Sequence, residues 1–90
     1  MHVEYLKGVI DKLKTSWTRI LPWSYPTVTV RWDQKLDRGY TPEGIRLRRR
    51  HDRLEGRVVD YSDSHGLCFK VMFWGGQTAW YEPEEIGVTT

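Results

Sequence analysis

The feature of this sequence that most constrains its fold is an alternating segment that runs directly into two glycines. Residues 67–74 read Leu-Cys-Phe-Lys-Val-Met-Phe-Trp, so an extended chain would carry apolar side chains on both of its faces. Gly75-Gly76 follows, and a glycine pair of this kind is typical of the tight turn of a β-hairpin. Residues 78–81, Thr-Ala-Trp-Tyr, then return as the second strand. The segment therefore predicts a hairpin whose first strand lies in the interior of a sheet.

Further short strands are predicted on both sides of this hairpin. Residues 45–48 alternate Ile-Arg-Leu-Arg and predict a strand with a basic outer face, and residues 57–61 predict another that ends in a polar turn at 62–66. After the hairpin, residues 82–86 predict a tight helical turn that leads into a short last strand. Four or five short strands at a spacing of roughly ten residues indicate a small antiparallel barrel or sandwich.

The start of the chain predicts one amphipathic α-helix from Val3 to Leu21, ended by Pro22. Its apolar residues recur every three or four positions and form one stripe. The stripe, with the tryptophan that follows it, consists of Val3, Leu6, Ile10, Leu13, Trp17, Ile20 and Trp23. Two interpretations fit: the stripe packs on the barrel, or it is an arm that lies at a membrane interface or in a partner's groove. The lysines of the helix and the aromatic residues near its end are typical of an interfacial helix.

Between helix and barrel, the sequence predicts a connector with one strand. Thr27–Trp32 alternates strictly and predicts that strand, whereas Asp33–Glu43 is polar, contains glycine and proline, and predicts a loop. A loop of this length hints at a binding role or at mobility. The predicted division is therefore a helical arm at residues 1–22, a connector at 23–43 and a barrel at 44–90.

Length, charge and cysteine content limit the classes of protein that fit. Ninety residues support one modest core, and a formal net charge of +2 says little about partners by itself. Cys68 is the only cysteine, which excludes an internal disulfide and a cysteine-based metal cage and favours a reducing compartment. No apolar run approaches the roughly 20 residues of a membrane span, and no signal peptide opens the chain. We expect a cytoplasmic protein, either free or peripheral at the inner face of a membrane.

The strongest candidate binding surface is a basic run near the start of the predicted barrel. Its arginines are Arg46, Arg48, Arg49, Arg50 and Arg53. On one strand, alternate arginines would line a single outer face and attract phosphates or an acidic protein surface, and a merely solvated face is the alternative. Exposed rings beside that face would stack on nucleic-acid bases, and the candidates are Trp74, Trp80, Tyr81 and Tyr61. A small barrel needs most of its aromatic residues inside, so a core role for these rings is favoured.

Two clusters invite a catalytic or metal interpretation. Residues 62–65, Ser-Asp-Ser-His, hold the residue types of a hydrolase triad, but neighbours in one turn cannot adopt its geometry, so we expect turn hydrogen bonds and no catalysis. His65 and Cys68 lack a second pair of ligands, so neither a metal nor a cofactor is predicted. The acidic residues of 82–85 predict a structural ion pair with an arginine of the basic run.

The second half of the chain resembles a known group of small barrels. The residues that carry the resemblance are, in order, Gly56-x-Val58, a polar turn ending in Gly66, Val71-x-Phe73, the glycine turn, Trp80-Tyr81 and Pro83-Glu84-Glu85-Ile86. This order is similar to SH3-like barrels such as the PsaE-type accessory proteins of photosystem I and their relatives in electron-transfer complexes. The resemblance covers residues 44–86 and implies an accessory or docking role.

A second, shorter resemblance lies in the first half. Tyr5-Leu6-Lys7-Gly8-Val9 and then Thr27–Val30 followed by Arg31-Trp32 resemble the amino-terminal arm of the iron–sulfur subunit that joins the two arms of respiratory complex I and related hydrogenases. In that family the arm lies on the membrane surface and leads into two iron–sulfur clusters. This chain lacks the cluster cysteines, so the resemblance implies anchoring and nothing about a cluster.

We therefore expect a mainly β protein with an SH3-like small antiparallel barrel of four or five strands, preceded by one N-terminal amphipathic helix. The expected function is a non-catalytic accessory or docking subunit that binds a protein partner in a larger complex. In the sharpest version, that complex is a membrane-associated electron-transfer complex. The alternative is a nucleic-acid-binding barrel that uses the basic face from Arg46 to Arg53. No small-molecule substrate is predicted, and an enzyme is the least favoured class.

Overall fold

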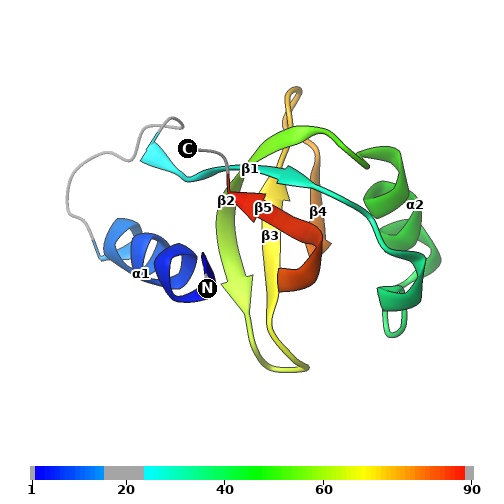
Figure 1. Cartoon of the computed structure of the whole chain (residues 1–90), viewed down its shortest axis with the longest axis horizontal. Coiled ribbons are helices and arrows are strands. Elements are labelled where there is room, and N and C mark those ends of the chain that lie inside the picture. The colour runs from blue at the N-terminus through cyan, green and yellow to red at the C-terminus, as the bar shows by residue number, and fades with distance from the viewer. Residues whose placement is uncertain (1, 16–23, 89–90) are drawn as a thin grey trace.

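The computed structural model describes residues 2–15 and 24–88, which form a five-stranded antiparallel sheet and two α-helices (Figure 1). The strands are β1 (Thr27–Val30), β2 (Glu55–Ser62), β3 (Cys68–Met72), β4 (Thr78–Tyr81) and β5 (Ile86–Val88). The helices are α1 (His2–Lys14) and α2 (Pro42–Arg50), and two 3-10 turns are η2 (Gln34–Leu36) and η3 (Pro83–Glu85). The strand order is β4-β3-β2-β1-β5, so β4 and β5 are edges and the sheet is not closed into a barrel. The predicted antiparallel sheet of four or five strands and the N-terminal helix are confirmed, whereas the second α-helix, α2, was not predicted.

The predicted hairpin is confirmed, and its first strand is an interior strand. β3 pairs with β2 on one side and with β4 on the other. At the turn, the Phe73 amide donates to the Gln77 carbonyl at 2.8 Å, and the Gly76 amide donates to the Phe73 carbonyl at 3.0 Å. Gly75 and Gly76 have φ angles of +96° and +88°, a backbone region that side chains disfavour. Trp74 therefore stands at the tip of a turn that glycine and the backbone make.

The hydrophobic core contains residues of all five strands and of helix α1. Its buried apolar members are Leu6, Ile10, Val28, Val30, Val58, Phe69, Val71, Phe73, Ala79, Tyr81 and Ile86. Gly56 is part of this packing because it leaves no room for a side chain. A Cβ atom there would lie 2.7 Å from Val71 Cγ1 and 2.8 Å from the Met72 carbonyl oxygen. Close approach of two strands requires glycine at this position.

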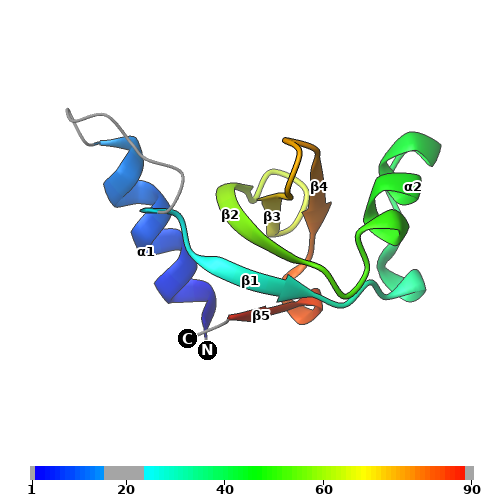
Figure 2. The ribbon, with the colours of Figure 1, turned by 90° about the horizontal axis from the view of Figure 1, so that it is seen from above.

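Helix α1 packs against the sheet, which corrects the prediction of a membrane or partner arm for Leu6 and Ile10. Both side chains are fully buried in the core, and Leu13 is partly buried. The helix lies beside β1 and β2 in both views (Figures 1 and 2). Helix α1 covers apolar side chains of the open sheet. Burial of this apolar surface stabilises the fold more than the exposed polar contacts of α1 do. The other predicted members, Trp17, Ile20 and Trp23, lie outside the described residues, as does the predicted helix end at Leu21.

Polar contacts fix α1 to β2. Lys14 Nζ lies 2.5 Å from Asp60 Oδ1, and the Tyr61 hydroxyl donates to Asp11 Oδ1 at 2.7 Å. Partial burial raises the pKa of Asp60, but the hydrogen bonds from Lys14 and from the Tyr61 amide outweigh it, so that pKa is lowered on balance. Within residues 2–15 and 24–88, neither α-helix has the length and apolar character that crossing a bilayer requires.

The predicted strand at 45–48 is wrong, because these residues belong to helix α2. The Thr41 hydroxyl accepts a hydrogen bond from the Gly44 amide at 3.0 Å, and Pro42 occupies the first turn. A threonine cap followed by proline is a strong helix-start signal, and arginines in the last turn suit the helix dipole. A four-residue alternation cannot outweigh these signals. The predicted loop at 33–43 accordingly contains η2 and the start of α2, and β1 ends at Val30, two residues earlier than predicted.

Candidate functional site

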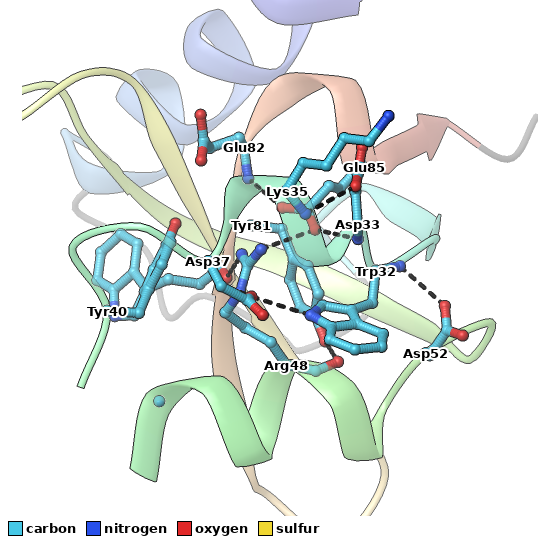
Figure 3. A network of polar contacts seen from close by, with 12 residues as sticks. Trp32, Asp33, Lys35, Asp37, Tyr40, Arg48, Asp52, Tyr81, Glu82 and Glu85 are labelled. Atoms are coloured by element: carbon cyan, nitrogen blue, oxygen red, sulfur yellow. Dashed lines mark hydrogen bonds and ion pairs between the residues drawn. The ribbon is translucent and has the colours of Figure 1, made fainter. Parts of the chain in front are cut away.

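Arg48 fixes the site region from inside the protein (Figure 3). Its side chain is 0% exposed, which corrects its prediction as a surface binding residue. Arg48 donates hydrogen bonds from Nε to Asp37 Oδ1 at 3.0 Å, from Nη1 to the Trp80 carbonyl at 2.7 Å and from Nη2 to Glu85 Oε2 at 2.8 Å. One guanidinium group thus joins α2 to the loop before it, to β4 and to η3. We call this cluster of Arg48, Asp37, Glu85 and the Trp80 carbonyl the Arg48 network.

Two tyrosine rings enclose the guanidinium group. Arg48 Cζ lies 4.2 Å from the centroid of Tyr40 and 5.3 Å from that of Tyr81, distances at which a cation is attracted to a ring. The Tyr81 hydroxyl donates to the Arg48 carbonyl at 2.8 Å, and burial raises the pKa of Tyr81, which keeps this hydroxyl protonated. Tyr81 is fully buried, so its prediction as a binding residue is also wrong. Its role is to support α2.

The two carboxylates of the network accept further hydrogen bonds. Glu85 Oε2 accepts from the Asp33 amide at 2.8 Å and Glu85 Oε1 from the Glu82 amide at 3.1 Å. Asp37 Oδ1 accepts a second hydrogen bond, from Trp32 Nε1 at 3.0 Å. The structural ion pair predicted for the acidic residues is therefore confirmed for Glu85, although its arginine comes from a helix. A buried charge is tolerated when it is paired in this way.

A groove of about 440 Å³ opens beside the Arg48 network. Its lining comes from the segment 36–40, from the β2–β3 turn, and from Cys68, Trp80 and Glu82. We call this the groove. The Tyr40 hydroxyl and Cys68 Sγ are 3.3 Å apart, and burial together with this contact raises the pKa of Tyr40. Arg48 against the Tyr40 ring and Cys68 against its hydroxyl therefore position this aromatic lining residue of the groove.

Glu82 is the acidic side chain of the groove, and its environment disfavours a negative charge. Partial burial raises the pKa of Glu82, the nearby carboxylates of Glu84 and Glu85 raise it further, and Arg48 and Arg38 only partly oppose them. A carboxylate in this situation is stabilised by a bound cation or hydrogen-bond donor. A ligand that brings such a group would relieve the repulsion.

The β2–β3 turn contributes polar atoms to the groove. Ser62 Oγ and Ser64 Oγ are 3.1 Å apart, and the Ser64 amide donates to Ser62 Oγ at 3.5 Å, so the predicted turn hydrogen bond is confirmed for Ser62. His65 lines the groove with Cys68. Among residues 2–15 and 24–88, no three histidine, cysteine, aspartate or glutamate side chains lie close enough to hold one metal ion.

The other predicted binding residues are separated into two surfaces. Trp80 is in the groove, whereas Trp74 and Arg50 share a second hollow at the β3–β4 hairpin. The arginines expected on one strand face lie instead on the exposed side of α2 and in the turn after it; they are Arg46, Arg49, Arg50 and Arg53. Sequence reasoning missed Tyr40, and it expected Glu82 in an ion pair and not in the lining of a groove. The one available signal for Tyr40 was the unusual length of the predicted polar loop in which it lies.

No protein-family model, curated protein or solved structure matches this chain in the three comparisons. Function is therefore inferred from the geometry of the groove and of the second hollow.

Proposed function

We propose that this protein is a non-catalytic docking domain whose groove binds an extended segment of a protein partner. The observation that carries the proposal is the groove itself: a hollow of about 440 Å³ with Tyr40 and Trp80 as aromatic walls and Glu82 as an unfavourably placed charge. Concave sites with apolar walls and a few placed polar groups are typical of ligand binding. The Arg48 network makes the site rigid, which lowers the entropy lost on binding.

We also propose that the fold is of the SH3-like type, with the sheet open between β4 and β5. The strand order β4-β3-β2-β1-β5, the tight β3–β4 hairpin and the 3-10 turn before the last strand support this assignment. Domains of that type bind extended, proline-rich peptides in aromatic-lined grooves. The comparison is one of fold, so it supports the class of ligand and not its identity.

The chemistry of the groove narrows the partner segment. An apolar or proline residue fits between Tyr40 and Trp80, and a lysine or arginine beside it would pair with Glu82. A basic group would also compensate the repulsion that Glu82 experiences from Glu84 and Glu85. We further propose that the partner belongs to a membrane-associated electron-transfer complex; this part is supported by the resemblance to the PsaE-type accessory proteins of photosystem I alone.

A displayed library of random peptides tests the docking function. We expect enrichment of peptides with a basic residue next to an apolar one, with micromolar affinity, and backbone amide shifts confined to the groove. Ser64→Trp adds bulk at an exposed rim position and should weaken binding at least tenfold, whereas the matched variant Ser24→Trp, at an exposed position outside the groove, should not. Glu82→Gln should selectively weaken the basic peptides.

Failure to enrich any peptide, or equal binding by the two tryptophan variants, would refute the docking function. The partner class is tested separately by native electrophoresis of detergent-solubilised membranes. Comigration with a redox complex supports it, and recovery only as a free monomer contradicts it.

A further inference from the structure

Among the large hydrophobic residues that the structure describes, Trp74 alone is 100% exposed. The turn does not need it, because the hydrogen bonds there are made by the backbone of Phe73, Gly76 and Gln77. An exposed indole forgoes a large amount of apolar burial. A single exposed hydrophobic residue needs no explanation by itself, so the role of Trp74 has to be inferred from what lies beside it.

A hollow of about 330 Å³ lies next to Trp74, between the hairpin and the end of α2. Its floor is fixed: the His51 ring stacks on Phe73 with centroids 4.3 Å apart and an angle of 9°, and His51 Nε2 is 3.1 Å from Gln77 Oε1. Arg50 and the half-exposed Leu54 line its sides. The exposed Glu55 also lines the hollow, so its lining combines aromatic, apolar, cationic and acidic side chains, with the cation supplied by Arg50.

Arginines extend from the hollow along the exposed face of α2. Arg46, Arg49 and Arg50 are spaced three and four residues apart, so they share one helix face, and Arg53 follows in the next turn. We call these four residues the arginine stripe. Within the described residues, Arg46 pairs with Glu43 and Arg53 with Asp52 at 3.9 Å, while no carboxylate pairs with Arg49 or Arg50. Arg49 instead lies 5.9 Å from the Trp32 ring. Arg50 lines the hollow, and neither Arg50 nor Arg49 has a carboxylate partner among the described residues that an anionic ligand would have to displace.

We propose that this surface binds single-stranded nucleic acid, with one base stacked on Trp74 in the hollow and the phosphates along the arginine stripe. Ring stacking beside a basic track is how proteins hold single strands without sequence preference. A duplex keeps its bases stacked inside and cannot fill the hollow. A lipid bilayer is planar and would also leave the hollow empty. The helix dipole accounts for arginines at the end of α2, but it does not account for Trp74.

Fluorescence anisotropy with labelled dT12 and rU12 tests the proposal on the whole chain. The Arg46–Glu43 pair is exposed and therefore weak, so Arg46 can exchange Glu43 for a phosphate. Three phosphate contacts from Arg46, Arg49 and Arg50 then predict a slope of log affinity against log salt of about −2. Loss of one stacked base in Trp74→Ala predicts a weakening of roughly 5- to 150-fold. The matched control is Tyr5→Ala, which removes an exposed ring on α1. Both positions are exposed, so both variants should keep the wild-type melting temperature.

Charge is tested with two double variants of equal net charge. Arg46→Gln with Arg50→Gln should reduce the salt slope by about 1.4, and Lys12→Gln with Arg31→Gln, both exposed and outside the stripe, should leave it unchanged. Ser64→Trp in the groove should bind oligonucleotides normally, which separates this proposal from the docking function.

Three results would overturn the proposal. The first is no anisotropy change at 20 mM salt. The second is wild-type affinity in Trp74→Ala, and the third is an equal loss in both double variants. Binding to phosphatidylserine vesicles that depends on Trp74, without binding of the oligonucleotides, would assign the surface to membranes instead and would also refute it.

Discussion

Replacing Arg48 by methionine tests the physical account of the site most directly. The variant keeps a long apolar side chain in the cavity but removes all three hydrogen bonds that Arg48 donates. The Glu85 side chain, 0% exposed, and the Asp37 side chain, 14% exposed, are then left without their cation. The Trp80 carbonyl also loses the donor that Arg48 provides.

The expected loss follows from what remains buried. Removing one partner of a buried ion pair costs about 3–5 kcal/mol, because the other charge stays desolvated. A chain of 90 residues has a total free energy of unfolding of about 5–13 kcal/mol. Arg48→Met should therefore lose a large part of its stability and melt about 12–40 °C below the wild type. Urea and thermal unfolding followed by far-ultraviolet circular dichroism measure both quantities.

Two companion variants separate charge from packing. Arg49→Met, on the exposed side of the same helix, should change stability by less than about 0.5 kcal/mol. Adding Asp37→Asn and Glu85→Gln to Arg48→Met removes the unpaired charges and should recover at least about 1 kcal/mol. The reasoning is refuted if Arg48→Met costs less than about 1 kcal/mol, or if the triple variant is less stable than the single one.

Three further substitutions probe the packing and the attachment of α1. Gly56→Ala should cost about 3 kcal/mol in urea unfolding, because its Cβ would meet Val71 and strand backbone at under 3.0 Å, and an unchanged midpoint would contradict this packing. Gly8→Ala, with nothing within 4 Å, should instead gain about 0.5–1 kcal/mol, and a loss would mean that α1 is not helical there. The pKa of Asp60 is lower in the folded protein than in the unfolded chain. Its pair with Lys14 therefore stabilises the fold fully at pH values above the unfolded-state pKa, and this stabilisation is lost as the pH falls through the folded-state pKa. Hydrogen exchange of the α1 amides measures this loss as the pH is lowered, and Asp60→Asn should make it smaller. Identical pH profiles for the variant and the wild type would exclude the Lys14–Asp60 pair as the cause of the loss.

The predictable part of the fold is the part that local chemistry determines. The β3–β4 hairpin follows from alternation and two glycines, and the turn at 82–86 follows from its proline and acidic residues. The strand predicted at 45–48 fails because Ile-Arg-Leu-Arg satisfies a two-residue period over too few positions. Thr41 and Pro42, just before this segment, are the stronger signal, because threonine at the N-cap followed by proline in the first turn is typical of a helix start. This signal has to be compared with the alternation before either is used to predict the element.

The site was less predictable, because its parts come from distant positions. Tyr40 meets Cys68 across 28 positions, and Arg48 meets Glu85 across 37. No periodicity in the sequence encodes such contacts. An arginine run also does not reveal which member turns inward; in α2 that depends on the helix face, so Arg48 is buried while Arg49 is exposed.

The placement of α2 has a consequence for how the two proposed surfaces would work together. Arg48 points inward and holds the wall of the groove, whereas Arg49 and Arg50 point outward on the same helix. The groove reaches the β2–β3 turn and the Trp74 hollow reaches the β3–β4 hairpin, at opposite ends of the five residues of β3 (Figure 1). Among the residues that the structure describes, none lines both. A peptide in the groove and a single strand at Trp74 should therefore bind at the same time, and saturating one site should leave the affinity of the other unchanged. Competition between them would mean that α2 shifts on binding, and that the Arg48 network transmits the shift.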